Sequence, residues 1–92
     1  RHPEALNALG YAWAEQGRNL EEAAKMIRQA LELRPRSGAF MDSLGWVRFR
    51  QGRFSDAETC LRQALAWMED GSDPDPVIRG HLDEVLRKKG GR

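Results

Sequence analysis

The string Arg28-Gln29-Ala30-Leu31 recurs unchanged as Arg62-Gln63-Ala64-Leu65, 34 residues further along the chain. Two shorter strings return in the same order: Leu9-Gly10 as Leu44-Gly45, and Gln16-Gly17-Arg18 as Gln51-Gly52-Arg53, each 35 residues on. Fixed periods in this range are the signature of repeat architectures. The change of one residue in the period is explained by Asn19, which we expect to lie in a turn that tolerates an insertion. The chain therefore contains two copies of one structural unit.

Apolar residues within each unit follow a helical period. In the first unit, Leu6, Leu9, Gly10 and Trp13 lie at i, i+3, i+4 and i+7, and a second stripe runs over 20–31. The second unit repeats both stripes, from Met41 to Gly45 and from Phe54 to Leu65. Each unit is predicted to be an antiparallel pair of helices joined by a tight turn.

Local signals predict where these helices begin and end. Gly17 is expected to end the first helix in a left-handed conformation. Asn19 with Glu22, and Ser55 with Glu58, have the spacing of capping boxes that open the second helix of each pair. Pro35 is expected to stop the first unit soon after Leu33.

Two glycines, Gly10 and Gly45, fall in helix interiors, where glycine costs about 1 kcal/mol relative to alanine. We expect close contact with a neighbouring helix to offset this cost. Four segments are predicted: repeat one over 3–36, repeat two over 37–69, a polar linker over 70–75, and a capping helix over 76–89 that Pro76 begins. The linker is expected to be mobile and to bind no calcium, because its acidic residues lack the spacing of a calcium loop.

Composition excludes several classes of protein. Fifteen basic and fourteen acidic side chains give the 92 residues a net charge of +1, which argues against nucleic-acid binding. The single cysteine cannot form an intramolecular disulfide. No apolar run approaches the ~20 residues that span a bilayer, and the first residues do not form a signal peptide. We expect an excised fragment, whose compartment the sequence does not indicate.

No motif in the sequence points to catalysis. The two histidines, His2 and His81, stand in no cluster with metal-ligand spacing, so neither a metal nor another cofactor is expected. Cys60 has no histidine in its own unit, which favours a packed thiol over a nucleophile. Phosphate-binding glycine loops are absent. We expect Trp13 and Trp67 to pack in the interior.

These residues together resemble the tetratricopeptide repeat family, and most closely the repeats of bacterial scaffold proteins. The resemblance rests on these positions: Leu6, Leu9, Gly10, Trp13, Gly17, Ala23, Ile27, Ala30 and Pro35, then Met41, Leu44, Gly45, Gly52, Phe54, Ala57, Leu61 and Ala64. It implies an all-α, right-handed solenoid of two helix pairs and a C-terminal capping helix. Arg48, Glu69 and Asp83 depart from the family's pattern, since apolar, proline and small residues are usual there.

The resemblance also implies that the first helix of each pair lines a concave groove. Aromatic side chains beside polar groups are typical of peptide-binding surfaces. The groove residues predicted on this basis are Asn7, Tyr11, Asp42, Trp46, Phe49, Arg50, Glu84 and Arg87. The basic side chains with which some family members clamp a terminal carboxylate are missing, so that activity is not expected.

Two hypotheses of function follow. The first is a non-catalytic module that binds a peptide, a helix or a protein surface in the groove. The second is a structural segment of a longer solenoid, or a self-association module, which exposed apolar residues on the first and last helices would favour. The side chain of Trp46 separates them: if it faces the groove, Trp46→Ala leaves the melting midpoint nearly intact, whereas Trp13→Ala lowers it. Equal losses would place Trp46 in the core and favour the second hypothesis.

Overall fold

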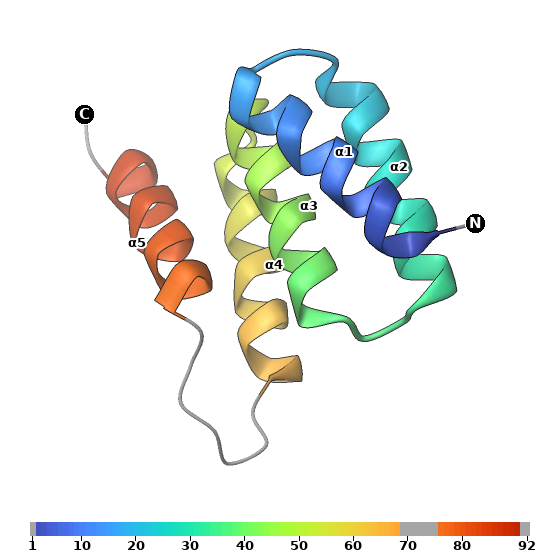
Figure 1. The fold of residues 1–92 in the computed structure, drawn as a ribbon. Coiled ribbons are helices and arrows are strands. Elements are labelled where there is room, and N and C mark those ends of the chain that lie inside the picture. Colours follow the sequence, from blue (N-terminus) through green and yellow to red (C-terminus); the bar gives the residue numbers. More distant parts are fainter. Residues whose placement is uncertain (1, 69–75, 91–92) are drawn as a thin grey trace.

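The computed structural model describes residues 2–68 and 76–90, and these residues form five α-helices. Helix α1 spans Pro3–Gln16, α2 Leu20–Leu33, α3 Gly38–Arg50, α4 Phe54–Trp67 and α5 Pro76–Gly90. Helices α1 and α2 form one antiparallel pair, α3 and α4 form a second, and α5 lies beyond α4 (Figure 1). The all-α prediction is confirmed. The predicted linker, 70–75, lies outside the described residues.

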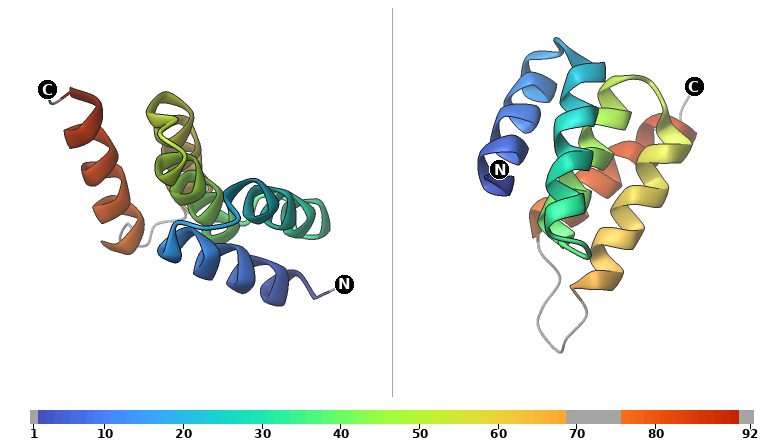
Figure 2. Two further views of the ribbon diagram at one scale, coloured as in Figure 1. Left: turned by 90° about the horizontal axis from the view of Figure 1, so that it is seen from above. Right: turned by 90° about the vertical axis from the view of Figure 1, so that its right-hand side faces the viewer.

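The helices stack in chain order, as the two further views of the ribbon show (Figure 2). Small and branched apolar residues build two neighbouring core clusters. One joins α1, α2 and α3 around Ala23, Ile27 and Val47, and the other joins α4 and α5 around Leu61 and Ile78. Helix α5 packs mainly on α4 and touches α3 much less. The last described helix therefore packs on the second pair, mainly through α4.

The interior glycines lie in close contact with a neighbouring helix, as predicted. A Cβ added to Gly10 would stand 2.7 Å from Cγ1 of Ile27, and one added to Gly45 would stand 2.9 Å from Cγ of Leu61. Both contacts join the two helices of one pair. The absent side chain allows the pair to approach, which offsets the poor helix propensity of glycine.

Three of the predicted helix signals are confirmed. Gly17 has φ 69°, and its N–H donates to the carbonyl of Ala14, so it ends α1 in the left-handed conformation. Helix α2 ends at Leu33, just before Pro35, and Pro76 begins α5. An unpredicted cap opens α3, where the hydroxyl of Ser37 accepts a hydrogen bond of 3.2 Å from the amide of Phe40.

Both predicted capping boxes are wrong. Asn19 adopts a left-handed conformation with φ 53°, and its side chain makes no capping hydrogen bond. In the second unit α4 begins at Phe54, with Arg53 in the capping position, so Ser55 already lies within the helix. Asn19 cannot form the box because a capping residue needs an extended backbone, and Ser55 cannot because it is not at the capping position.

One contact ties the two pairs together through a side chain. Nε of Arg50, at the end of α3, donates a hydrogen bond of 2.9 Å to the carbonyl of Ala14 in the last turn of α1. That carbonyl belongs to the negative end of the helix dipole, where a cation is favourable. Within the described part of the chain, no helix combines the length and the apolar character that crossing a bilayer requires.

Candidate functional site

Side chains from three helices meet around His81 of α5. Its Nδ1 lies 2.8 Å from Oδ1 of Asp42 on α3, and its Nε2 lies 3.4 Å from the hydroxyl of Tyr11 on α1. When the imidazole is neutral, Nδ1–H donates to the carboxylate and Nε2 accepts from the phenol. The side chains of His81 and Asp42 are only 13% and 10% exposed. His81 therefore fixes α5 to α1 and α3 from a largely buried position.

The arrangement of hydroxyl, imidazole and carboxylate invites comparison with a nucleophilic relay. A nucleophile needs a lowered pKa, but the pKa of Tyr11 is raised to about 12. Burial is the main cause, and the carboxylates of Glu15 and Asp42 add to it. The environment thus keeps the phenol protonated, so the contact serves to hold the helices rather than to activate the oxygen.

A row of rings runs from His81 along α3, stacked as far as Phe49 and tilted at Phe54. The ring centroids of His81 and Trp46 are 4.1 Å apart, those of Trp46 and Phe49 are 4.7 Å apart, and Phe49 continues to Phe54 at 5.5 Å. Trp46 is half-buried and packs against the same core cluster as Trp13. The expectation that its indole faces a groove stays a prediction, and His81 of α5 stacks on the ring.

Two buried polar atoms on the first helices make no hydrogen bond within the described residues: Oδ1 of Asn7 and Nε1 of Trp46. Each lies on a helix that the resemblance places along the groove. A buried donor or acceptor without a partner costs about 1–3 kcal/mol. Packing of the helices around these atoms must therefore outweigh that cost.

A cleft of about 380 Å³ opens where the row of rings ends. Phe49 and Phe54 give it an aromatic wall, while Arg50, Glu84 and Lys88 line it with charge. The cleft lies between the α3–α4 turn and α5. Arg87 is near its edge and forms an ion pair with Glu84.

The eight predicted groove residues thus fall into two groups. Asn7, Tyr11, Asp42 and Trp46 lie in the packed part, and the last three surround His81. The other four, Phe49, Arg50, Glu84 and Arg87, lie in or beside the cleft. Sequence reasoning placed His81 at a groove position but did not include it among the eight predicted binding residues. The only signal was its place on the groove-facing stripe of the last helix, since nothing in the chain predicts its partner 39 residues away.

Metal binding finds no support in this geometry. Among the residues that the structure describes, no three histidine, cysteine or carboxylate side chains converge as metal ligands would. Burial raises the pKa of the Cys60 thiol, and Asp56 adds to this while Arg48 opposes it. The thiol is therefore poorly suited to act as a nucleophile.

Stacked antiparallel helix pairs with a further packed helix define a helical repeat protein. The family model described as Tetratricopeptide repeat matches residues 39–67, which cover most of α3 and α4. The TPR repeat-containing protein PA4667 of Pseudomonas aeruginosa is 44% identical over 80 residues, or 87% of this chain. The chain belongs to the tetratricopeptide repeat family. It spans 13% of the length of that relative.

Proposed function

We propose that this tetratricopeptide repeat module binds a partner protein without catalysis, and that the cleft between the α3–α4 turn and α5 receives a peptide or helix of that partner. The proposal rests on one observation: aromatic and charged side chains line the same cleft. Phe49 and Phe54 offer apolar surface, and Glu84 with Lys88 offers opposite charges at the rim. An aromatic anchor with a polar rim is typical of protein-binding surfaces.

The packed part of the groove defines how a ligand would approach. His81 covers Trp46 and pairs with Asp42, so these side chains support the cleft from behind. Phe49 stacks on Trp46 and reaches the cleft, which makes it the anchor in place of Trp46. A ligand then enters at the open end of the row of rings.

Selection of peptides from a random display library on the folded chain tests this proposal. Affinity of a selected peptide is then measured by fluorescence anisotropy for Phe49→Ala and for Glu84→Lys, which alters the rim without touching the core. We expect Phe49→Ala to weaken binding at least about tenfold, or ~1.4 kcal/mol. Leu33→Ala is the matched control, because it removes an apolar side chain at the far end of the stack. Selected peptides that tolerate both cleft variants would contradict the proposal.

A second function is favoured by a separate observation: the module extends or joins a longer stack of helices. Leu9 and Leu33, on the outermost pair, are 41% and 51% exposed, and Leu86 on α5 is also exposed. A hollow of about 590 Å³ on that first pair is lined by Leu6, Gln29, Glu32 and Leu33. An unpaired apolar edge is what a neighbouring helix pair covers in a solenoid.

Sedimentation equilibrium tests this alternative. If the edge takes part in self-association, the apparent mass rises with concentration and Leu33→Ser returns it to that of the monomer. A constant monomer mass would leave only a neighbouring segment of a longer chain as the occupant of the edge. Peptide binding at the cleft would be unaffected in either case, so the two functions are separable.

A further inference from the structure

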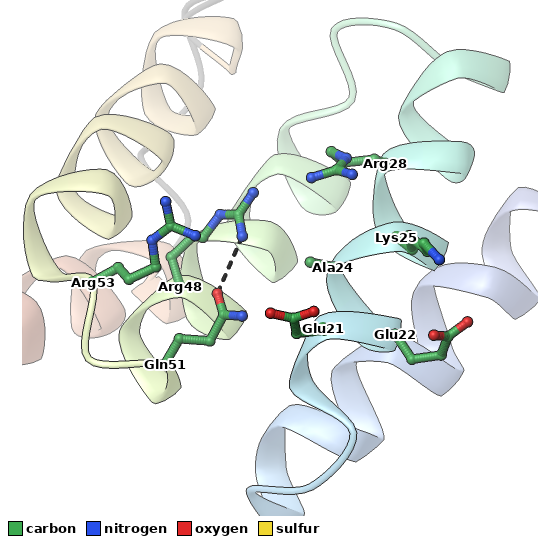
Figure 3. Close-up of a pocket in the computed structure, with 8 residues that line it drawn as sticks. All are labelled: Glu21, Glu22, Ala24, Lys25, Arg28, Arg48, Gln51 and Arg53. Carbon is green, nitrogen blue, oxygen red and sulfur yellow. Dashed lines mark hydrogen bonds between the residues drawn. The ribbon is translucent and has the colours of Figure 1, made fainter.

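A second pocket, of about 360 Å³, lies between α2 and the α3–α4 turn. Ala24 stands at its base, Arg28 and Glu21 line it from α2, and Arg48 and Gln51 line it from the other side. None of its lining residues comes from α1 or α5, so it is separate from the cleft proposed to bind a peptide. In Figure 3 the guanidinium of Arg28 reaches toward those of Arg48 and Arg53 across the gap.

Comparison of the two repeats shows why Arg28 is available to a ligand. Its counterpart in the second repeat, Arg62, donates a hydrogen bond of 2.8 Å to Glu58 one turn earlier. The counterpart of Glu58 in the first repeat is Ala24, which is small and 3% exposed. Arg28 therefore makes no ion pair among the described residues. Because repeat one has alanine where repeat two has glutamate, it lacks this carboxylate and leaves space above the helix.

Arg48 provides a second unneutralised cation by a different route. Its counterpart in the first repeat is Trp13, which packs against the core. Arg48 is half-buried, and its hydrogen-bond partner is the neutral side chain of Gln51, whose Oε1 accepts at 3.1 Å. No carboxylate of the described chain lies within ion-pair distance of Arg48. A partly desolvated cation of this kind gains from an anionic partner.

The remaining charges decide what such a partner can be. Arg53 is already paired with Asp56 at 3.1 Å, and Lys25 and Glu22 point away from the gap in Figure 3. The carboxylate of Glu21 lies at the edge near Gln51. The lining thus carries two carboxylates, Glu21 and Glu22, and four cations, of which Arg28 and Arg48 have no ion-pair partner among the described residues. The space between them is large enough for one side chain or a short peptide stretch.

We propose that this pocket binds a carboxylate side chain from an acidic segment of a partner protein, held between Arg28 and Arg48. Guanidinium groups bind carboxylates through paired N–H donors, which gives both strength and orientation. A protein segment suits the site better than a phosphate dianion, because Glu21 at the edge repels the higher charge. The module would then contact partners on two faces, through the cleft beside α5 and through this pocket beside α2.

Fluorescence anisotropy with a fluorescein-labelled octaglutamate peptide tests the proposal on the intact chain. We expect saturable binding at low ionic strength that weakens as salt is added. Arg28→Gln is expected to weaken binding about tenfold, and Arg48→Met, which keeps the packing of the stem, by a similar factor. Arg62→Gln is the matched control: it removes the same charge at the equivalent position of the second repeat, outside the pocket.

Three results would overturn the proposal. The first is that octaglutamate does not bind saturably. The second is that Arg62→Gln weakens binding as much as Arg28→Gln, which would indicate general charge attraction. The third is that inorganic phosphate at equal concentration displaces the peptide, which would make the pocket a phosphate site. Circular dichroism melts of Arg28→Gln, an exposed position, check that the variant is folded. Loss of octaglutamate binding in Phe49→Ala is not expected, so failure here is distinct from failure of the cleft.

Discussion

Nδ1 of His81 lies 2.8 Å from Oδ1 of Asp42, and this bond joins the last helix to the third across 39 residues of sequence. The side chain of Asp42 is 10% exposed, so water does little to solvate its carboxylate. The bond thus fastens α5 at the point where its contacts with α3 are few. It also places the imidazole on the indole of Trp46.

Removing the imidazole should loosen α5. His81→Ala leaves the carboxylate of Asp42 buried without its partner, and such a loss costs about 1–3 kcal/mol. Asp42→Asn keeps an oxygen that accepts from Nδ1–H and should cost less. Urea denaturation followed by circular dichroism measures both. Unchanged stability in His81→Ala would show that the bond contributes nothing to the docking of α5.

Replacement of Trp13 or Trp46 should lower the melting midpoint. Trp13 and Trp46 pack against the same core cluster, and a core Trp→Ala change costs roughly 3–5 kcal/mol. Both side chains are half-buried, so for each we expect about 2–3 kcal/mol, less than for a fully buried tryptophan. Thermal melts of the two variants give the comparison. If Trp46→Ala melted like the parent chain, the indole of Trp46 would contribute little to packing, as the open-groove prediction requires.

Larger residues at the interior glycines should destabilise the helix pairs. Gly45→Leu forces a side chain into Leu61 and Cys60, and overpacking of this kind costs about 1–3 kcal/mol. Gly80 is the internal control, because a Cβ there meets nothing within 4 Å. Gly80→Ala should instead stabilise α5 by about 0.5–1 kcal/mol. Chemical denaturation of both variants would refute the close-contact account if the two changes had the same sign.

Tyr11 should titrate at an unusually high pH. It is the single tyrosine of the chain, so absorbance near 295 nm reports it alone. Burial is the main cause that raises its pKa from 10.0 to about 12. A raised pKa in the folded state means that its contribution to stability is complete below pH 10 and is lost as the pH rises toward 12. Glu15→Gln should bring the midpoint back toward 10.0, since Glu15 also raises this pKa.

Glu58 should make the docking of α5 sensitive to acid. Its carboxylate accepts from Arg62 at 2.8 Å and from Lys89 of α5 at 2.7 Å, and these two bonds lower its pKa below 4.5. For a lowered pKa, the contribution to stability is present above the unfolded value and is lost as the pH falls through the folded one. We expect the melting temperature of the parent chain to decrease once the pH is lowered below 4.5. In Glu58→Gln this part of the fall should be missing.

The helix pairs could be predicted from the sequence because their signals are local. The recurring strings fix the register of the two units, and Gly10 and Gly45 mark where paired helices touch. The site was harder to predict, since it depends on how α5 packs. His81 meets Asp42 only because α5 leans on α4, a relationship that no periodicity encodes. Arg50 lines the cleft, but the hydrogen bond from its Nε to the carbonyl of Ala14 could not be predicted from the sequence.

That last contact also makes the order of the repeats matter. The residue of repeat one that corresponds to Arg50 is Glu15. If repeat one were copied behind repeat two, a carboxylate would stand where the guanidinium now meets the last turn of the preceding helix. The carboxylate and the C-terminal end of that helix are both negative, so they would repel each other at the junction. The two units are therefore not interchangeable modules, and shuffling them by recombination would yield an array weaker than the one that exists.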